Sequence, residues 1–283
     1  MSEKLLSEEE FWQRAGKYKD SLDIEFVKTI DSTNSELLRR LEKNLCKEPF
    51  LLASEMQTAG HGRVGRKFYS PQKDGIYFSY TRAFDQEKRD ISFYTTSAAV
   101  GLCRAIKKVY GAQCSIKWVN DIYLGGRKIA GILAEGFVSP QSGKLESIVT
   151  GIGINLRLNQ TLLTQEDSLA LQRAGGIEDF ADKKGVSPTL LLATCIDEIF
   201  SILDSDPSST SSPSSTFMEE YKSLSMLTGK TVSVTSLASA AVQSYKAKVL
   251  GISDDAGLVV QTEDGSVRTL RSGEVSLHES KLD

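Results

Sequence analysis

The sequence has little of several features that mark common kinds of protein site. Only two histidines occur, so a histidine-rich metal centre is excluded. No C-x-x-C spacing is present and no histidine lies near a cysteine, so zinc ligation by this chain alone is not expected. The four scattered cysteines are Cys46, Cys103, Cys114 and Cys195. We expect them to be reduced, structural thiols in a reducing compartment.

Membrane and nucleic-acid features are scarce as well. No apolar run approaches the roughly 18 residues that a membrane helix needs. The acidic start of the chain lacks the basic, apolar and small-residue regions that follow one another in a signal peptide. The 34 Lys and Arg residues against 37 Asp and Glu residues give a net charge of −3, which excludes a broadly basic nucleic-acid coat. We therefore expect a soluble cytoplasmic protein without membrane or nucleic-acid partners, although one small basic site remains allowed.

The 283 residues predict one large domain and a smaller one, which we place at 1–227 and 228–283. Apolar periodicity predicts a short polar helix within 1–22, a helix that starts at 31, and helices at 93–109, 161–172, 187–204 and 215–227. Strands are predicted at 23–30, 50–54, 75–81, 115–119, 128–138 and 145–156. The Ser/Thr/Pro-rich stretch 205–216 is expected to be a mobile surface loop.

The predicted helix that starts at Asp31 shows a start signal and an apolar stripe. Thr33 followed by Glu36 fits a capping box. The stripe that we expect to be buried consists of Leu37, Leu38, Leu41 and Leu45.

The last fifty residues have a different texture, with short strands at 231–235, 242–252, 258–262 and 267–270. Turns at 254–257 and 263–265 join them. This pattern is typical of a small SH3-like β-barrel.

A glycine-rich basic loop lies between the second and third predicted strands. Gly60-His-Gly-Arg-Val-Gly65 matches G-x-G-x-x-G, but it leads into a turn and a strand, whereas a dinucleotide loop opens a helix. A Walker A loop is excluded because Arg66-Lys67 follows the last glycine, and no kinase motifs follow downstream. From Met56 to Lys73 there are four basic residues and no acidic one. Such a loop is either a solvated basic turn or a site at which arginines bind phosphate or carboxylate.

Two later segments carry further polar groups. Lys117-Trp-Val-Asn-Asp121 follows one strand, and Lys128 opens the next, where its ammonium group is expected at the strand mouth. Gly151-Ile-Gly-Ile-Asn155 ends a third strand, where bare backbone would let a ligand lie flat on the sheet. Each segment alone is a weak signal; together they place basic groups, amides and bare backbone around one sheet.

The sequence resembles the biotin–protein ligases from Ile24 to the C-terminus. The motifs that carry the resemblance, in the family's order, are Asp31-Ser-Thr-Asn34, Gln57-Thr-Ala-Gly-His-Gly-Arg-Val-Gly-Arg66, Lys117-Trp-Val-Asn-Asp121, Arg127-Lys-Ile-Ala-Gly-Ile-Leu133 and Gly151-Ile-Gly-Ile-Asn155. The chain end, Ser272-Gly-Glu-Val-Ser-Leu277, resembles the end of the family's C-terminal barrel. The resemblance implies an α+β fold, a mixed β-sheet backed by helices, followed by a small SH3-like β-barrel.

The resemblance implies a two-step reaction and a set of site residues. Biotin and MgATP would form biotinyl-AMP and pyrophosphate, and a lysine of the biotin carboxyl carrier domain of acetyl-CoA carboxylase or a related carboxylase would then accept biotin. Ser32, Thr33 and Gln57 would bind the ureido ring, the backbone of His61, Gly62 and Arg63 would close over it, and Gly151 would lie beneath; Asn34 and Gly60 belong to the same motifs. Lys128 would neutralise the carboxylate and α-phosphate. Arg63, Arg66, Lys117, Asn120 and Asp121 would address the nucleotide, with Asn155 near the adenylate.

Among these residues, Arg63, Lys128 and Asp121 are the predicted catalytic groups, and no direct metal ligand is assigned. Cations aimed at the phosphorus supply most of the catalysis in such a reaction, and an acyl-adenylate needs no nucleophile on the enzyme. The loops 60–73 and 120–127 are expected to be mobile without ligand and ordered by the adenylate. The chain departs from the family pattern at His61 and Val119, where Arg and Pro are usual, and at His278, where some members have Arg.

Other functions stay open at this point. A lipoate or octanoate ligase of the related fold would need an apolar channel in place of polar groups for a ureido ring. A biotin-responsive regulator would need a DNA-binding domain, for which only 22 residues precede Asp23. A non-catalytic SH3-like module would leave the basic loop without a role. We expect a monomer or a weak homodimer.

Overall fold

The computed structural model describes residues 5–71, 74–84, 90–158, 173–205, 213–235, 244–271 and 274–277. Its helices are α1 (Glu8–Arg14), α2 (Thr33–Glu42), α3 (Ile91–Tyr110), α5 (Pro188–Leu203) and α6 (Pro213–Ser223). The first seven strands are β1 (Asp23–Val27), β2 (Phe50–Ser54), β3 (Gly75–Ala83), β4 (Ser115–Lys117), β5 (Asp121–Leu124), β6 (Arg127–Val138) and β7 (Leu145–Asn155). The last five are β8 (Thr231–Thr235), β9 (Ser244–Ile252), β10 (Leu258–Thr262), β11 (Val267–Leu270) and β12 (Glu274–Leu277).

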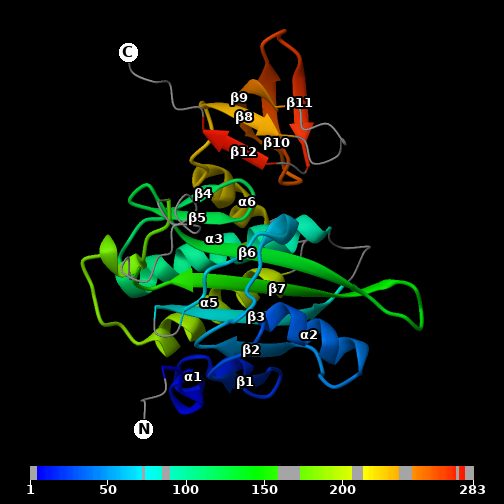
Figure 1. Cartoon of the computed structure of the whole chain (residues 1–283), viewed down its shortest axis with the longest axis vertical. Coiled ribbons are helices and arrows are strands. Elements are labelled where there is room, and N and C mark those ends of the chain that lie inside the picture. The colour runs from blue at the N-terminus through cyan, green and yellow to red at the C-terminus, as the bar shows by residue number, and fades with distance from the viewer. Residues whose placement is uncertain are drawn as a thin grey trace.

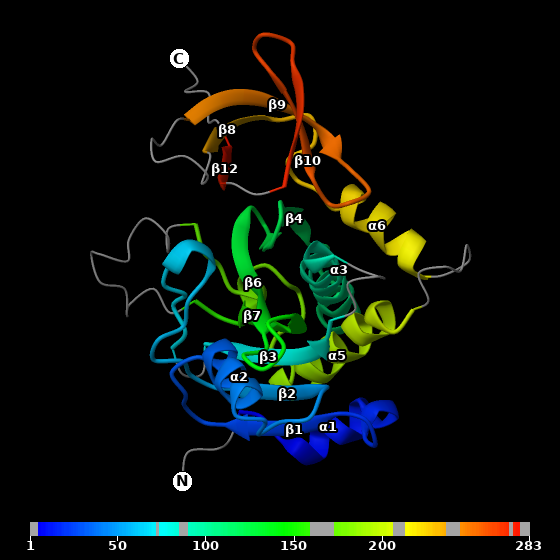
Figure 2. The ribbon, with the colours of Figure 1, turned by 90° about the vertical axis from the view of Figure 1, so that its right-hand side faces the viewer.

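Seven strands form one mixed sheet in the order β1-β2-β3-β7-β6-β5-β4 (Figure 1). Strands β1 and β2 are parallel, and the other neighbours are antiparallel. Helices α3 and α5 cover one face of this sheet, and α2 lies against the other (Figure 2). The predicted α+β fold, a mixed sheet backed by helices, is confirmed.

Side-chain alternation along the central strands separates a core face from a face that carries polar groups and glycine. In the pairing of β3 with β7, Ile76 lies opposite Ile154 and Phe78 opposite Ile152, and all four belong to the main hydrophobic core. The residues between them in β7 are Gly151 and Gly153. One face therefore packs against α3 and α5, while the other offers bare backbone near the start of α2.

The C-terminal strands form a separate five-stranded antiparallel sheet in the order β11-β10-β9-β8-β12. Its own hydrophobic cluster includes Val232, Val249 and Leu258. This sheet corresponds to the predicted C-terminal β-domain, and it stands beyond β4 and α6 (Figures 1 and 2).

Backbone and side-chain contacts join the two sheets. The segment after α6 runs along the edge strand β4, where the N–H of Ile116 donates to Leu224 O (2.7 Å) and the N–H of Met226 donates to Ile116 O (3.0 Å). The buried Trp118 packs in the C-terminal hydrophobic cluster, and its indole Nε1–H donates to Ala256 O at 2.8 Å. These contacts fix the turn after β4 between the two sheets.

The predicted capping box of α2 is wrong. Ser32 is the N-cap, and its Oγ accepts a hydrogen bond of 3.4 Å from the backbone N–H three residues on. Glu36 does not reach back to the helix start, because its two carboxylate oxygens bind Arg39 and Arg40 at 2.7 and 2.8 Å. The N–H of Thr33, to which Glu36 would have reached back, is buried and already donates to Gln57 Oε1 at 2.8 Å. The charge-assisted bonds to the two arginines hold the Glu36 carboxylate instead.

Other element predictions need correction. Leu45 is 68% exposed, because α2 already ends at Glu42. The predicted short helix within 1–22 is present as α1, and its Phe11 is fully buried in the main core. Helix α6 begins at Pro213, so the end of the predicted loop 205–216 is helical. The remainder of that loop (206–212) and the predicted helix 161–172 lie outside the described residues.

The expected loop 120–127 is mostly β-strand. Strand β5 pairs with both β4 and β6, and it was missed because its four residues are too few for periodicity to reveal. Gly125 and Gly126 then form the hairpin turn with φ values of +57° and +76°, which glycine adopts without strain. None of the described helices is long and apolar enough to span a membrane.

Candidate active site

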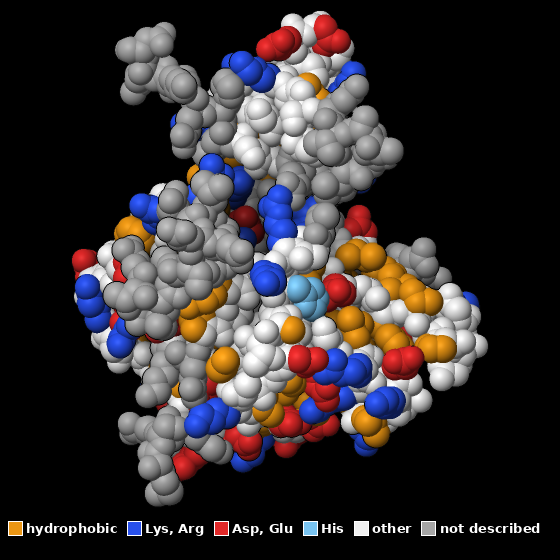
Figure 3. Space-filling model, in the orientation of Figure 1, with side chains coloured by type: hydrophobic (Ala, Val, Ile, Leu, Met, Phe, Trp, Pro, Cys, Tyr) orange, Lys and Arg blue, Asp and Glu red, His pale blue; other side chains and the backbone are white. Residues whose placement is uncertain are grey.

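A cavity of about 520 Å³ lies over the glycine-bearing face of the large sheet. Its walls come from the start of α2, the glycine-rich loop, the β4–β5 turn, strands β6 and β7, and two residues of β12. Lys and Arg side chains gather around the hollow between the large sheet and the C-terminal sheet (Figure 3). The site therefore uses both parts of the chain.

One end of the cavity is a buried network of uncharged polar groups. The backbone N–H and the Oγ1–H of Thr33 both donate to Gln57 Oε1, at 2.8 and 3.1 Å. The Oγ of Ser79, fully buried in β3, lies 2.7 Å from Thr33 Oγ1 and 2.6 Å from Asn34 Oδ1. Because these groups hold one another in place, this end presents fixed donors and acceptors to a neutral polar ligand.

The floor between the two ends is glycine. Gly131 of β6 lies opposite Gly153 of β7 in the sheet, and Gly151 is the next residue of β7 on the same face. A Cβ atom at Gly151 would lie 2.1 Å from Asn34 Oδ1, and one at Gly153 would lie 2.4 Å from the ring of Phe68. Only glycine lets these side chains approach the sheet so closely, so Gly151 and Gly153 are needed for Asn34 and Phe68 to pack against the backbone at the cavity floor.

The glycine-rich loop folds back over this floor without opening an α-helix. His61 and Lys67 form an isolated antiparallel β-bridge, and the N–H of Gly62 donates to Arg66 O at 2.7 Å. A single 3₁₀ turn spans Arg63–Gly65. Gly65 has a φ of +70°, which a side chain would strain. The rejection of a dinucleotide-binding helix is thus confirmed, and the loop brings its arginines to the cavity.

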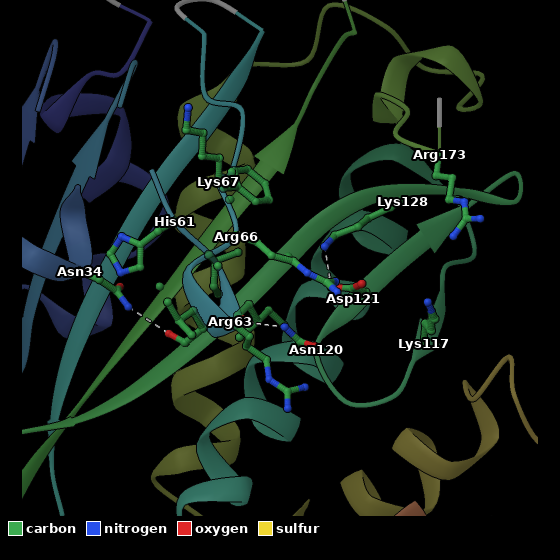
Figure 4. Close-up of a pocket in the computed structure, with 18 of the residues that line it drawn as sticks. Asn34, His61, Arg63, Arg66, Lys67, Lys117, Asn120, Asp121, Lys128 and Arg173 are labelled. Atoms are coloured by element: carbon green, nitrogen blue, oxygen red, sulfur yellow. Dashed lines mark hydrogen bonds and ion pairs between the residues drawn. The ribbon is translucent and has the colours of Figure 1, made fainter. Parts of the chain in front are cut away.

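The other end of the cavity is cationic. Six cations line the cavity among the described residues, and Lys117, Lys128 and Arg173 lie on the side away from His61 and Asn34 (Figure 4). Asp121 is the one carboxylate on the described lining. Lys128 Nζ lies 2.6 Å from Asp121 Oδ1. Burial lowers the pKa of Lys117, and the like charges of Lys128, Arg173 and Arg66 lower it further against the opposing effect of Asp121. Such an end is suited to a ligand with several negative charges.

Comparisons with known proteins agree with this geometry. Residues 26–155 match the biotin/lipoate A/B protein ligase family, and residues 229–278 match the biotin protein ligase C-terminal domain. The chain carries a biotin/lipoate ligase catalytic domain and a biotin protein ligase C-terminal domain. Both matched segments contribute residues to the cavity wall.

Individual relatives differ in how much of their length is matched. The biotin–[acetyl-CoA-carboxylase] ligase of Paracoccus denitrificans is 36% identical over 130 residues, 44% of this chain and 51% of that protein. The bifunctional ligase/repressor BirA of Salmonella typhimurium is 27% identical over 268 residues, 93% of this chain and 76% of that protein. This chain spans about half the length of most of the curated relatives that it matches.

A solved structure shows the same fold. The biotin protein ligase from Aquifex aeolicus, solved in complex with biotin and ATP, superposes with a TM-score of 0.68 at 24% identity. The match covers 90% of this chain and 98% of that one, so it includes both sheets.

The predicted site residues come together in one cavity, with two exceptions. Those that line the cavity are Ser32, Thr33, Asn34, Gln57, His61, Gly62, Arg63, Arg66, Lys117, Asn120, Asp121, Lys128 and Gly151. Their roles toward a ligand stay predictions.

Gly60 and Asn155 do not line the cavity. A Cβ at Gly60 would lie 2.7 Å from Ser70 Oγ and 2.9 Å from Phe68 O, so this glycine allows the loop to pack. The Asn155 amide donates to Gly175 O at 3.3 Å, at the end of β7. Asn34 lines the cavity, but its Nδ2 already donates to Glu135 Oε2 at 2.7 Å and to Leu133 O at 3.2 Å. It therefore acts first as a support between α2 and β6.

His61 and Val119, the two described residues that depart from the family pattern, each contact neighbouring residues of the chain. His61 Nε2 lies 3.6 Å from Glu135 Oε2, which turns the side chain toward β6 and away from the cationic end. Val119 packs against the C-terminal cluster, and its carbonyl accepts a hydrogen bond of 2.9 Å from the hydroxyl of Tyr221. His278 lies outside the described residues.

Sequence reasoning missed several lining residues. They are Phe68, Trp118, Tyr123, Gly131, Arg173, Val275 and Ser276. Gly131 could have been found from the glycine in Arg127-Lys-Ile-Ala-Gly-Ile-Leu133, because it breaks an apolar run. No local pattern marks Tyr123 or Arg173, since both reach the cavity through pairing with β6.

Proposed function

We propose that this protein is an ATP-dependent ligase that activates biotin as biotinyl-5′-AMP and transfers it to a lysine of a carboxylase's biotin carrier domain. The observation that carries the proposal is one cavity with two chemically distinct ends. A buried hydrogen-bonding end at Thr33 and Gln57 is joined by a glycine-bearing floor to a cationic end with Lys117, Lys128 and Arg173. A neutral ureido ring suits the first end, and a triphosphate suits the second. The relatives named as biotin–[acetyl-CoA-carboxylase] ligases support the same conclusion.

In the first step the cavity would align biotin with ATP. The ureido ring would bind at Thr33 and Gln57, and the aliphatic chain would cross the glycine floor toward Lys128. Two anions, a carboxylate and a phosphate, repel each other, so Lys128 would have to offset that repulsion at the point where they meet. A carboxylate oxygen of biotin would bond to the α-phosphorus, and pyrophosphate would leave. Positioning and charge are the main contributions that such a transfer asks of the protein.

Mg²⁺ enters the proposal together with ATP and would supply further positive charge at the phosphates. Asp121 is the one carboxylate that lines the cavity among the described residues, and it already forms an ion pair with Lys128. We therefore assign Mg²⁺ to phosphate oxygens and give it no direct protein ligand.

In the second step the amine of a carrier lysine would attack the acyl carbon of biotinyl-AMP and release AMP. We assign Asp121 to this amine. When Lys128 turns to the phosphate, the Asp121 carboxylate is left to accept a hydrogen bond from the incoming amine. We also propose a cytoplasmic location, because ATP is a substrate, and a monomer or weak homodimer as the working unit.

Pyrophosphate release tests the first step. The full-length protein should release pyrophosphate when given biotin and ATP, and much less when lipoate or octanoate replaces biotin. Lys128→Gln should lower the rate by about 10²–10³-fold with an unchanged melting temperature. The exposed Lys144, which is remote from the cavity, provides the control Lys144→Gln, whose rate should match that of the unaltered protein. No pyrophosphate release with any of the three acids would refute the proposal, and preference for lipoate would assign the other substrate class.

A further inference from the structure

The cationic end of the main cavity holds more positive charge than its neighbours neutralise. Lys117 comes from the end of β4, Lys128 from the start of β6, and Arg173 from the segment that follows the undescribed residues 159–172. Asp121 is the one lining carboxylate there among the described residues, and its ion pair is with Lys128 (Figure 4). Within the described part of the chain, neither Lys117 nor Arg173 forms an ion pair.

The backbone fixes where Arg173 stands. The N–H of Lys128 donates to Arg173 O at 2.8 Å, and the N–H of Gly175 donates to Lys128 O at 2.9 Å. These two bonds make a short parallel bridge between Ala174 and Lys128. Arg173 is thus held beside the start of β6, and its guanidinium lines the cavity on the same side as Lys117, opposite Asn34 and His61 (Figure 4).

Lys117 indicates what this end lacks. Lys117 is half-buried. Burial is the main cause of its lowered pKa; Asp121 opposes this effect, and the like charges of Lys128, Arg173 and Arg66 add to it. A partly buried ammonium among other cations is unfavourable unless enough negative charge faces it, and Asp121 is already paired with Lys128. An anion with several charges and several oxygens would satisfy both groups at once, since guanidinium presents a fork of donors.

We propose that Arg173, with Lys117, binds the β- and γ-phosphates of ATP and the pyrophosphate that leaves. This inference rests on the proposed function. In the first step a biotin carboxylate oxygen bonds to the α-phosphorus, and the bond from that phosphorus to the bridging oxygen of the β-phosphate breaks. The bridging oxygen leaves with the electron pair as part of pyrophosphate. Arg173 neutralises the charge that grows on this leaving group, while the AMP portion stays on biotin.

The test variant is Arg173→Gln, which keeps a polar side chain of similar length and removes the charge. Arg173→Lys keeps the charge but lacks the paired N–H donors of guanidinium. Its affinity for pyrophosphate should lie between that of Arg173→Gln and that of the unaltered protein. The matched control is Arg268→Gln, an exposed arginine on β11 that lies outside the cavity. Thermal unfolding of each full-length variant establishes that the fold is retained.

Calorimetric titration with inorganic pyrophosphate alone tests the subsite without turnover. Losing one charge-assisted fork should weaken pyrophosphate binding about tenfold in Arg173→Gln and leave Arg268→Gln unchanged. Equal affinity in Arg173→Gln and the unaltered protein, or no pyrophosphate binding by the unaltered protein, would overturn the assignment.

The two half-reactions give a second readout. Arg173→Gln should raise KM for ATP about tenfold, leave KM for biotin unchanged, and transfer biotin from presynthesised biotinyl-AMP within about twofold of the normal rate, because pyrophosphate is absent from that step. Equal losses in both half-reactions would contradict a leaving-group role. If the unaltered protein released no pyrophosphate from biotin and ATP, the proposed function would fail, whereas the pyrophosphate titration would still decide the role of Arg173.

Discussion

At the scale of single residues, the glycines of β7 decide what can lie on the sheet. Gly151 faces Asn34, whose amide is held by Ser79, Leu133 and Glu135, so Asn34 has no easy route away from an added methyl group. Gly153 instead faces the ring of Phe68, the end of a side chain that can rotate. The two glycines should therefore differ in their tolerance of substitution.

Gly151→Ala should lower the free energy of unfolding by roughly 1–3 kcal/mol, because the new Cβ would overlap Asn34 Oδ1 and strain the network around it. It should also weaken biotin binding, which fluorescence or calorimetric titration can measure. Gly251→Ala is the matched control, since Gly251 is also in a strand but has open space at its Cβ position. If the two variants had equal free energies of unfolding in urea, the close contact between Gly151 and Asn34 would not contribute to stability.

Glu48 gives a pH-dependent prediction about stability. Burial raises the pKa of its carboxyl group above the ordinary value, against the lowering effect of the hydrogen bond from Ser147. Its Oε1 has no hydrogen-bond partner among the described residues. For an acid whose folded-state pKa is raised, the folded state is penalised once the group ionises. The penalty is absent below the unfolded pKa and reaches its full size above the folded pKa.

Glu48→Gln should therefore raise the free energy of unfolding by up to about 1 kcal/mol at pH 7 and by much less at pH 4. Urea unfolding at the two pH values measures the difference. The exposed Glu42 at the end of α2 supplies the control Glu42→Gln, for which little change is expected. A gain for Glu48→Gln that was larger at pH 4 than at pH 7 would reverse the sign and refute this account.

At the scale of elements, the β4–β5 turn links the C-terminal sheet to the cavity. Trp118 is buried in the C-terminal cluster and donates to Ala256 O, while its neighbour Lys117 and, two residues on, Asn120 line the main cavity. Asn120 is held in turn by donating to Ile132 O at 2.8 Å. The C-terminal sheet thus positions the turn that carries part of the cationic end.

Trp118→Phe should lower the free energy of unfolding by about 1–2 kcal/mol, because Ala256 O loses its donor and the smaller ring leaves a gap. It should raise KM for ATP more than KM for biotin, since the moved turn belongs to the cationic end. Trp12→Phe provides a control in α1, at the opposite edge of the molecule. A rise in KM for ATP of equal size in both variants would indicate general loosening and not positioning by the turn.

Element predictions from the sequence succeeded where periodicity was long and failed where local rules compete. Helix α3 and strands β6 and β7 were found within a few residues, because each carries a long apolar pattern. Strand β5 and the N-cap of α2 were not found. A four-residue strand shows no periodicity, and the partner of Glu36 depends on two arginines whose geometry the sequence does not reveal.

Site residues followed the same division. Thr33, Gln57 and Lys128 were predicted because they belong to compact motifs, and they line one cavity. Arg173 and Tyr123 were not, because they reach the cavity only when their segments pair with β6. Gly60 and Asn155 were predicted as site residues because they belong to the same motifs, but neither lines the cavity. Their contacts hold the chain in place outside it.

At the scale of the whole molecule, a nearly balanced charge conceals an uneven distribution. The whole chain has a net charge of −3. In contrast, six cations and one carboxylate line a single cavity among the described residues. A second cavity of about 330 Å³ at the junction of the two sheets shares Arg63, Trp118 and Asn120 with the first. The division into domains 1–227 and 228–283 stays a prediction, with the boundary between the end of α6 at Ser223 and the start of β8 at Thr231.

The central claim is that one cavity joins biotin to ATP and then delivers the acyl group to a lysine. The most direct measurement is mass spectrometry of a biotin carrier domain after incubation with the full-length protein. We expect one biotinyl group on one lysine when biotin and ATP are both present, none when either is omitted, and the same product from presynthesised biotinyl-AMP without ATP. An unmodified carrier domain with biotinyl-AMP, or labelling from biotin without ATP, would contradict it.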